Sequence, residues 1–373
     1  MNLLSLFDEM LSKKASDMHI RSNTKAYLRI NGDLHAMENM EIPQSSEIEE
    51  MILGYMNEDQ RRTFYSKHEC DLGLTIENKG RFRLNVFKQR GDVNAAIRHV
   101  PLEVPSIEAL SLPISIKKLA ENDRGLVLVT GPTGCGKSST LAAMIDHINT
   151  NFKSHVITIE DPIEFLHKDK KSIISQRELN IDTTSYPEAL RHVVRQDPDV
   201  VLIGEMRDLE TMAAAITAAQ LGHFVLSTIH TIDTIQTVSR VVDMFPPHQQ
   251  AQIRYQFADT LKGIVSQRLI PRANGQGQIP AVEVLAATSL VKKYIEENNQ
   301  VELRSVIKQG QYYGMQSFDQ AILKLYQDGK IKLEDGLAAA TSAEELMMAV
   351  RGIETSVESA TSFTLERFDM PNK

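Results

Sequence analysis

The sequence predicts a two-domain protein whose larger domain is an α/β fold built on a mostly parallel sheet. The chain has 373 residues, more than one hydrophobic core usually holds. Four short apolar segments alternate with helical segments from residue 125 onward, the pattern of a parallel sheet covered by helices. The first of these segments leads directly into a glycine-rich loop, 131–136, and then into a helix.

Residues 1–100 are expected to form the smaller domain, of α+β type. Apolar residues at helical spacing predict helices over 3–14 and 45–65. Alternating apolar and polar residues between turn signals predict strands over 16–20, 26–37 around an Asn31-Gly32 hairpin turn, 70–76, 80–91 and 92–100.

Residues 101–113 carry three prolines and are predicted to be a linker, so that the larger domain covers 114–373. Its buried strands are predicted over 125–130, 154–161, 198–205 and 223–230, with helices over 137–149, 187–196 and 208–221. From about 286 to 353 the chain is expected to be largely helical. Ser342 and Glu345 fit a capping box for the last helix, and the polar tail after Ile353 is expected to be loose.

Composition narrows the class of protein. The formal net charge of -8 disfavours a protein that coats nucleic acid. Cys70 and Cys135 have no metal-ligand spacing and are not expected to pair, which favours a reducing compartment. No apolar run approaches the ~18–20 residues of a membrane span. We therefore expect a soluble cytoplasmic protein that binds no nucleic acid.

The stretch GPTGCGKSST, 131–140, carries the chemistry, because it matches the pattern G-x-x-x-x-G-K-[ST] between a strand and a helix. The glycines let backbone N–H groups close around phosphates, and Lys137 reaches the outer phosphates of ATP. Ser138 places a hydroxyl on Mg²⁺. The predicted nucleotide-binding residues are Gly131, Pro132, Thr133, Gly134, Cys135, Gly136, Lys137, Ser138 and Ser139.

Cys135 offers a chemical probe of this loop. Its thiol lies beside the glycines that would hold phosphate. We expect the thiol to be accessible without nucleotide and covered when nucleotide binds.

Acidic residues follow two of the predicted strands. Glu205 ends one strand and is expected to contact Mg²⁺ or its water. Glu160, Asp161 and Glu164 follow another, and one of them is expected to act as general base toward the attacking water. His230 ends a third strand at the same edge of the sheet, where we expect it to sense the γ-phosphate.

Arginines are the third group of candidates, because phosphoryl transfer needs positive charge near the γ-phosphate. The first domain offers Arg83 and Arg98 on neighbouring strands. Arg191 and Arg195 lie one helical turn apart in the second domain. The alternative for the first pair is an ion pair with surface acids such as Asp71 or Asp92.

Six stretches spread along the chain carry a family resemblance: SDMHI, RFRLNVFKQRG, ITIEDPIEF, RQDPDVVLIGEMRD, STIHT and GMQSFDQAILKLY. On these stretches the chain resembles, over nearly its whole length, the type IV pilus retraction ATPases of the PilT and PilU (twitching motility) family, within the secretion ATPase superfamily. The resemblance implies a RecA-like ATPase core preceded by a PAS-like domain. It also implies site roles: Glu164 as catalytic base, Glu205 as Walker B acid, His230 as histidine-box residue, Arg83 and Arg98 reaching the γ-phosphate, and Arg191 and Arg195 near the phosphates.

The same resemblance implies a hexameric motor that retracts pili. Its partners would be other copies of itself, an inner-membrane pilus platform protein and possibly a paralogous retraction ATPase, and it would work in the cytoplasm, peripheral to the inner membrane. Two alternatives stay open: a pilus-extension or secretion ATPase of the same superfamily, and a nucleotide-gated accessory subunit with little turnover. Extension is disfavoured because the chain has two separated cysteines instead of a four-cysteine zinc insertion.

One departure leaves the choice between main and accessory retraction motor open. Retraction ATPases usually carry an AIRNLIR-like helix near the C-terminus, whereas this chain has ELRSVIKQG over 302–310. The stretch NEDQRRTFYSKHEC, 57–70, resembles PilU more than PilT.

Overall fold

The computed structural model describes residues 2–30, 32–38, 41–77, 79–100 and 103–352. The chain divides into two compact units. The first comprises the residues up to Glu103 together with Glu164–Leu166, and the second comprises Val104–Ile163 and the chain from His167 onward. The predicted loose tail after Ile353 lies outside the described residues. Within the described residues, no helix is both long and apolar enough to cross a membrane.

The predicted linker needs a correction. Residues 101 and 102 lie outside the described part of the chain, but Ile107 and Leu112 are buried in the core of the second unit. Both side chains pack with α4 and α5, the helices Ser115–Ala120 and Lys137–Asn151. Residues 104–113 therefore belong to the second unit, because their apolar side chains are buried there.

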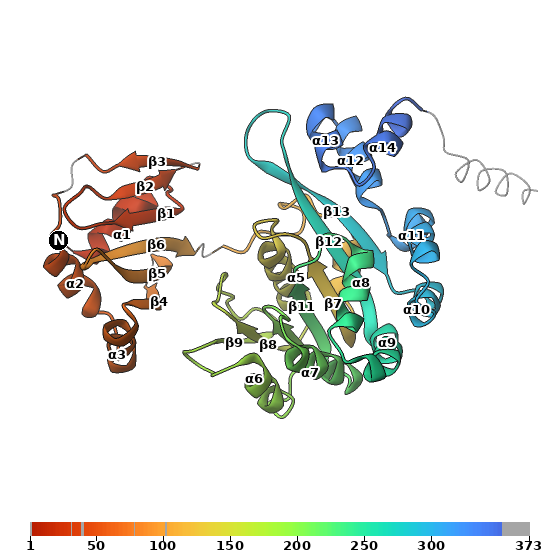
Figure 1. Ribbon diagram of the computed structural model, residues 1–373, viewed down its shortest axis with the longest axis horizontal. Helices are drawn as coiled ribbons and strands as arrows, with labels where there is room; N and C mark the ends of the chain where they lie inside the picture. Colours follow the sequence, from red (N-terminus) through yellow and green to blue (C-terminus); the bar gives the residue numbers. More distant parts are fainter. Residues whose placement is uncertain (1, 31, 39–40, 78, 101–102, 353–373) are drawn as a thin grey trace, which may run out of the picture. The chain divides into compact units, whose positions relative to one another are not determined.

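The first unit is a six-stranded antiparallel sheet with three helices (Figure 1). The strand order is β3-β2-β1-β6-β5-β4. The strands are β1 (Asp17–Ile20), β2 (Tyr27–Ile30), β3 (Asp33–Ala36), β4 (Glu69–Ile76), β5 (Gly80–Gln89) and β6 (Asp92–Val100). The helices are α1 (Leu3–Ser12), α2 (Ser45–Leu53) and α3 (Glu58–Lys67).

Alternation along the strands decides which face of this sheet is buried. On β5, Phe82, Leu84 and Val86 are buried, and they share one core cluster with apolar residues of all three helices. Phe7 of α1 stacks on Phe82 with ring centroids 3.8 Å apart. The side chains between them, including Arg83, point to the opposite face.

Two local expectations for the first unit are tested directly. The hairpin expected around Asn31-Gly32 is confirmed by the pairing of Ile30 with Asp33; Asn31 lies outside the described residues, and Gly32 has a positive φ of 97°. The helix expected over 45–65 is two helices. Asn57 caps the second one by accepting a hydrogen bond from the Gln60 N–H, which starts a new helix after Gly54.

The second unit is a seven-stranded sheet with helices on both faces, so the expected α/β class is confirmed (Figure 1). The order is β13-β12-β7-β11-β10-β8-β9, and only β13 is antiparallel to its neighbour. The strands are β7 (Gly125–Thr130), β8 (His155–Glu160), β9 (Ile173–Glu178), β10 (Val200–Ile203), β11 (Phe224–Ile229), β12 (Leu261–Pro271) and β13 (Gln278–Ala286).

Two core clusters cover the two faces of this sheet. One face packs on α4 and α5. The other packs on α6 (Tyr186–Val193), α7 (Leu209–Gln220), α8 (Thr234–Asp243), α9 (Pro247–Thr260), α10 (Ser289–Glu296) and α11 (Gln300–Gln309). Burial on both faces explains why the central strands are continuous apolar runs.

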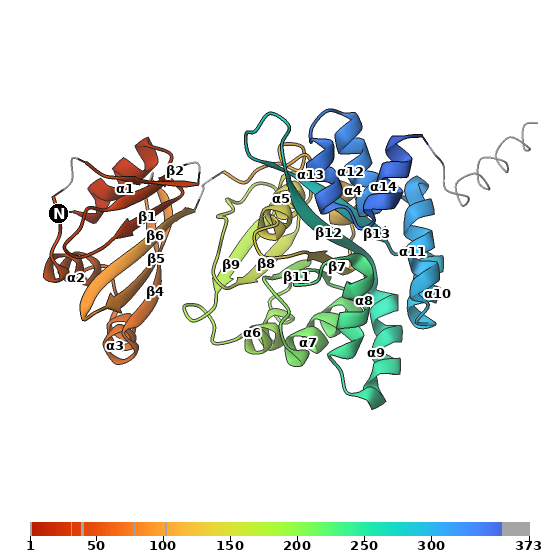
Figure 2. The ribbon, with the colours of Figure 1, turned by 45° about the horizontal axis from the view of Figure 1, so that its top comes forward.

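The last helices form a separate small cluster beside the β12–β13 hairpin (Figure 2). They are α12 (Phe318–Gln327), α13 (Leu333–Ala339) and α14 (Ala343–Val350). Ser342 caps α14 by accepting from the Glu345 N–H at 3.2 Å. The reciprocal half of the expected capping box is absent, because the Ser342 N–H donates to Asp319.

Candidate nucleotide-binding and hydrolysis site

The glycine-rich loop lies between β7 and α5, as predicted. Gly134 and Gly136 have φ values of 80° and 93°, and a Cβ added at either would meet nothing within 4 Å. Gly131 is different, since a Cβ there would come within 2.5 Å of the Cys135 Sγ and of the Gln267 carbonyl oxygen. All three glycines have a positive φ, 140° at Gly131, and Gly131 is required for packing as well, so the inner surface of the loop stays open.

Parallel pairing brings four strand ends to one edge of the sheet. The loop follows β7, while Glu160 ends β8, Glu205 follows β10 and His230 follows β11. The Met206 N–H donates to the Thr228 carbonyl at 3.0 Å, which joins the segment after β10 to the end of strand β11. This edge is where ligands bind in open α/β sheets.

Lys137, the first residue of α5, is 9% exposed and directs its ammonium group into the loop. Its Nζ donates to the carbonyl oxygens of Gly131 and Pro132, at 2.9 and 3.0 Å. It also lies 3.4 Å from the His230 Nδ1. The free backbone N–H groups of the first turn of α5, which includes Ser138 and Ser139, face the same loop and favour an anion.

His230 connects this lysine to the acid after β10. Its Nε2 lies 3.1 Å from the Glu205 Oε1. Because a lysine ammonium can only donate, the geometry fits a neutral imidazole that accepts from Lys137 at Nδ1 and donates to Glu205 from Nε2. The structure thus joins Lys137, His230 and Glu205 into one chain of contacts.

Arg207 completes the surroundings of Glu205. Its guanidinium lies 2.8 Å from the Glu205 Oε2. Burial by itself would raise the pKa of Glu205, but the hydrogen bonds that Arg207 and His230 donate, together with the positive charge of Arg207, outweigh burial and lower it. Glu205 is therefore an ionised carboxylate at neutral pH. Sequence reasoning did not single out Arg207, although a basic residue two positions after a strand-end acid was visible.

A second polar group lies beside Glu205. Tyr186 begins α6, and its hydroxyl comes within 2.7 Å of where a Cβ on Gly204 would be. Burial raises the pKa of Tyr186, and the carboxylates of Asp161, Glu160 and Glu205 raise it further. Tyr186 thus keeps its proton and can donate at this edge. No sequence motif pointed to Tyr186, since only the fold brings it to β10.

The structure assigns two acids at and after the end of β8, Glu160 and Glu164, to different units. Glu160 stays with the sheet, where it accepts from the Thr158 hydroxyl at 2.6 Å. Glu164, the residue assigned as catalytic base, is exposed and is grouped with Phe165 and Leu166 in the first unit. The contacts that join Lys137, His230 and Glu205 do not include Glu164.

Arg83 and Arg98 are direct cross-strand partners on β5 and β6, so their side chains leave the same face of the first sheet. The Arg98 Nε donates to the Asp17 Oδ1 at 2.7 Å. The acid partner of Arg98 is thus neither Asp71 nor Asp92 but a residue of β1.

Arg191 and Arg195 are not brought to the loop. Arg191 forms ion pairs with Glu188 and Glu210 on the surface of the second unit. Arg195 lies in the turn after α6 that leads to the amino end of β10, the sheet edge opposite the loop. The described contacts of Arg191 and Arg195 thus do not join the phosphate loop of their own chain, and their contribution near the phosphates stays a prediction.

Cys135 also differs from expectation. Its side chain is 4% exposed and its Sγ lies beneath Gly131. Burial raises the pKa of the thiol, although the nearby Lys137 lowers it. The thiol is thus inaccessible without nucleotide, because it packs into the base of the loop and does not line its inner surface.

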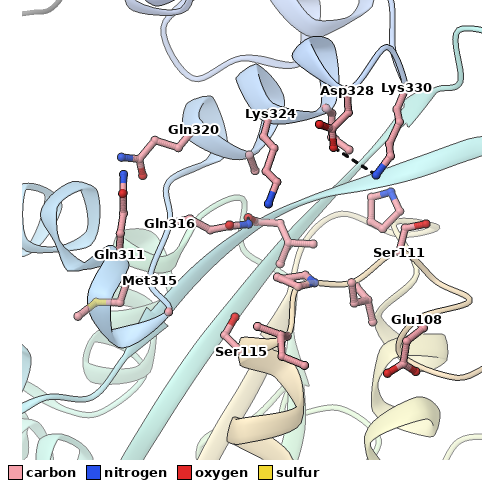
Figure 3. A pocket seen from close by; sticks show the side chains of 18 residues that line it. Glu108, Ser111, Ser115, Gln311, Met315, Gln316, Gln320, Lys324, Asp328 and Lys330 are labelled. Atoms are coloured by element: carbon pink, nitrogen blue, oxygen red, sulfur yellow. Dashed lines mark hydrogen bonds and ion pairs between the residues drawn. The ribbon is translucent and has the colours of Figure 1, made fainter.

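A separate cavity of about 730 Å³ lies in the second unit (Figure 3). Glu108, Ser111 and Ser115 line one side, and Lys324 and Gln320 of α12 the other. No residue of the 131–140 stretch, nor Glu205 or His230, is among the residues that line it. The cavity is therefore distinct from the nucleotide site.

A strand–loop–helix phosphate cradle with an acid and a histidine at adjacent strand ends defines a P-loop ATPase core. The family model described as Type II/IV secretion system protein matches residues 2–313. The chain belongs to this family, and it is an ATPase.

Three comparisons show how similar its relatives are. The type IV pilus ATPase PilU of Pseudomonas aeruginosa is 40% identical over 95% of this chain and 93% of its own length. The type IV pilus retraction ATPase PilT of the same species is 38% identical over 90% and 97%. The crystal structure of the pilus retraction motor PilT with bound ADP superposes with a TM-score of 0.87, at 40% identity over 92% of this chain and 98% of that one.

Proposed function

We propose that this protein is an ATP-hydrolysing motor that retracts type IV pili. The observation that carries the proposal is the contact chain Lys137–His230–Glu205 at the phosphate loop. It occurs in a chain that is about 40% identical to pilus ATPases over nearly all of its length. A motor needs such a site, because work on the pilus must be driven by hydrolysis.

ATP would be held with Mg²⁺. The Ser138 hydroxyl and the Glu205 carboxylate are oxygen donors of the kind that suits this ion. Within the described residues, no group of three or more His, Cys, Asp or Glu side chains forms a metal cage, which fits an ion held largely by phosphates and water. When bound, Mg²⁺ neutralises charge on the phosphates. Lys137 would bind the outer phosphates of ATP, and Glu205 would orient water bound to the Mg²⁺ ion.

We propose Glu164 as the general base, with Glu160 as the next candidate. Glu160 is held by Thr158 and lies at the sheet edge, so it has the more fixed position. Replacing the true base by glutamine removes proton acceptance and should lower turnover ~10²–10⁴-fold. Comparing Glu164→Gln with Glu160→Gln in a phosphate-release assay decides between them: whichever variant keeps wild-type turnover is not the base.

The assembly we propose is a homohexamer at the cytoplasmic side of the inner membrane. It would act on a pilus platform protein, with a paralogous ATPase as a further partner. Arg83 and Arg98 would reach the γ-phosphate from the first unit, and their cross-strand pairing supports a joint role. Light scattering with and without nucleotide tests the ring. A strict monomer at micromolar concentration with full specific activity contradicts it.

A gene deletion in cells distinguishes a retraction motor from an extension motor. Deleting the gene should leave cells with excess surface pili that do not retract, and a Lys137→Ala copy should not restore retraction. Cells without pili would instead indicate an extension motor. Purified protein that binds ATP but releases no phosphate would indicate the nucleotide-gated accessory subunit.

A further inference from the structure

Glu283 is a buried carboxylate that is not part of the nucleotide site described above. It lies on β13, is 8% exposed and pairs across the sheet with Ser266 of β12. A carboxylate buried in this way is costly unless its oxygens accept hydrogen bonds. Its partners therefore indicate what it holds in place.

The hydrogen-bond partners of Glu283 lie at the start of helix α8. The Glu283 Oε1 accepts from the Thr234 N–H at 2.9 Å and from the Thr234 hydroxyl at 2.7 Å. Burial raises the pKa of Glu283, whereas the hydrogen bonds from Thr234 and the nearby Phe318 backbone N–H lower it. Thr234 is the first residue of α8, and Phe318 is the first residue of α12. The Glu283 carboxylate thus satisfies the N–H group at the start of α8, where no intrahelical acceptor exists, and it faces the start of α12.

Thr234 follows His230 by four positions, so the start of α8 fixes the end of the segment that carries the histidine. A buried row of hydroxyls holds the same segment. The Thr231 and Thr237 hydroxyls are 2.7 Å apart, and Thr237 lies 3.4 Å from the Thr130 hydroxyl. Thr130 is the last residue of β7 and is bonded to Ser266 at 2.7 Å.

The polar contacts therefore connect β13 to His230, which in turn contacts Lys137 and Glu205. Glu283 anchors α8, α8 anchors the segment 231–233, and that segment holds His230 against Lys137 and Glu205. Both Glu283 and Thr234 are buried. Neither has a hydrogen bond or ion pair with a residue of the phosphate loop.

We propose that Glu283 is a positioning residue for ATP hydrolysis, which acts by fixing the start of α8 and thereby the place of His230 between Lys137 and Glu205. The proposal rests on the proposed role of His230 toward the γ-phosphate. Because the loop itself is untouched, loss of the Glu283–Thr234 contact should lower kcat and leave ADP affinity nearly unchanged.

Two independent variants test this in the full chain. Glu283→Gln keeps the volume but places an NH₂ group against backbone donors, and Thr234→Val removes the hydroxyl donor. Each should lower kcat by about 10- to 100-fold, as is typical when a hydrogen-bonded support of a site residue is lost. Thr234→Ser keeps the hydroxyl and should restore turnover to within a few-fold of wild type.

Ser172→Ala is the matched control. Ser172 is 3% exposed, and its hydroxyl donates to the Phe152 carbonyl at 2.8 Å, far in the sequence from the His230 segment. It should lose thermal stability while keeping wild-type kcat. If Glu283→Gln and Thr234→Val also keep wild-type kcat, or lose only stability as Ser172→Ala does, the proposal is overturned.

The variant His230→Ala distinguishes two errors: a wrong positioning role for Glu283 and a wrong site role for His230. Slow turnover in His230→Ala with wild-type turnover in both Glu283→Gln and Thr234→Val overturns only the positioning role. Wild-type turnover in His230→Ala overturns both. In the His230→Ala background, Glu283→Gln should cost less than about twofold, because two residues that act through one element are not additive.

Discussion

At the scale of single residues, the glycines of the phosphate loop differ in what they are needed for: Gly131 is needed for packing and Gly134 for nucleotide binding. Gly131 has neighbours within 2.5 Å of an added Cβ, and one of them is a backbone oxygen that cannot move away cheaply. Gly134 has free space around it and a φ of 80°. The two positions should respond differently to alanine.

We expect Gly131→Ala to lower the stability of the whole second unit, because the methyl group collides with Cys135 and Gln267. Gly134→Ala should fold with a melting temperature closer to wild type but bind nucleotide poorly, since its Cβ enters the space where phosphate would lie. Differential scanning fluorimetry and a fluorescent-nucleotide titration measure both. Equal melting temperatures for the two variants would contradict this reading of the loop.

The pKa of Glu205 gives a prediction on pH. Although burial favours the neutral acid, Arg207 and His230 lower this pKa below its ordinary value of 4.5. A carboxyl group with a lowered pKa in the folded state stabilises the fold above the unfolded value, and this stabilisation is lost as pH falls through the folded value. The stability advantage of wild type over Glu205→Gln should therefore be constant near neutral pH and shrink below pH 4.5.

Melting temperatures of both proteins from pH 7 down to 3.5 measure this difference. Arg207→Gln should flatten the dependence, because it removes a main partner of the carboxylate. An advantage that grows on acidification would mean that Glu205 is held as the neutral acid.

Several site residues were predictable from the sequence, and others were not. The loop, Glu205 and His230 follow from strand-end positions and one strong motif. The Lys137–His230 contact and the place of Tyr186 depend on which strands are neighbours in the sheet, and no local pattern gives that order, whereas Arg207 lies only two positions after Glu205. Cys135 was predicted on the inner surface, but the turn at Gly131 places its thiol underneath.

At the scale of elements, the apolar strands were predicted because burial on both faces leaves a continuous apolar run. The β12–β13 hairpin was missed because it carries buried polar side chains. Ser266 and Gln267 are 0% and 1% exposed and bond to Thr130 and Thr140, and Glu283 bonds to Thr234. These residues look like surface positions in the sequence, and only tertiary partners make their burial possible.

Packing of α1 on the first sheet gives a prediction about stability. Phe7 is 0% exposed and stacks on Phe82, so Phe7→Ala should cost about 3–5 kcal/mol. Phe152→Ala, at a ring that is 38% exposed, is the control and should cost much less. Denaturant unfolding followed by circular dichroism measures both. A cost for Phe7→Ala as small as that of Phe152→Ala would show that the stacked pair does not hold α1.

At the scale of the whole molecule, the proposed role of the first unit in hydrolysis can be tested. Arg83 and Arg98 face the same way from neighbouring strands, and we propose that they meet the γ-phosphate. The double variant Arg83→Ala, Arg98→Ala should slow hydrolysis while nucleotide affinity stays within several-fold, because the loop is unchanged. Lys308→Ala, at a surface ion pair of the second unit, is the control and should keep turnover.

A distance probe with one label in each unit gives a second readout. If ATP draws the arginines onto the phosphate, the nucleotide-dependent distance change should weaken in the double variant. Wild-type turnover together with a wild-type distance change would leave Arg98 with only its ion pair to Asp17.

The central claim is that Lys137, His230 and Glu205 form one site that hydrolyses ATP. Steady-state phosphate release by the purified wild type and Glu205→Gln, with nucleotide affinity measured on the same samples, tests it most directly. We expect measurable turnover in the wild type, a loss of ~10²–10⁴-fold in Glu205→Gln and affinities within several-fold of each other. Turnover in Glu205→Gln equal to that of the wild type, or no phosphate release by the wild-type protein, would contradict the claim.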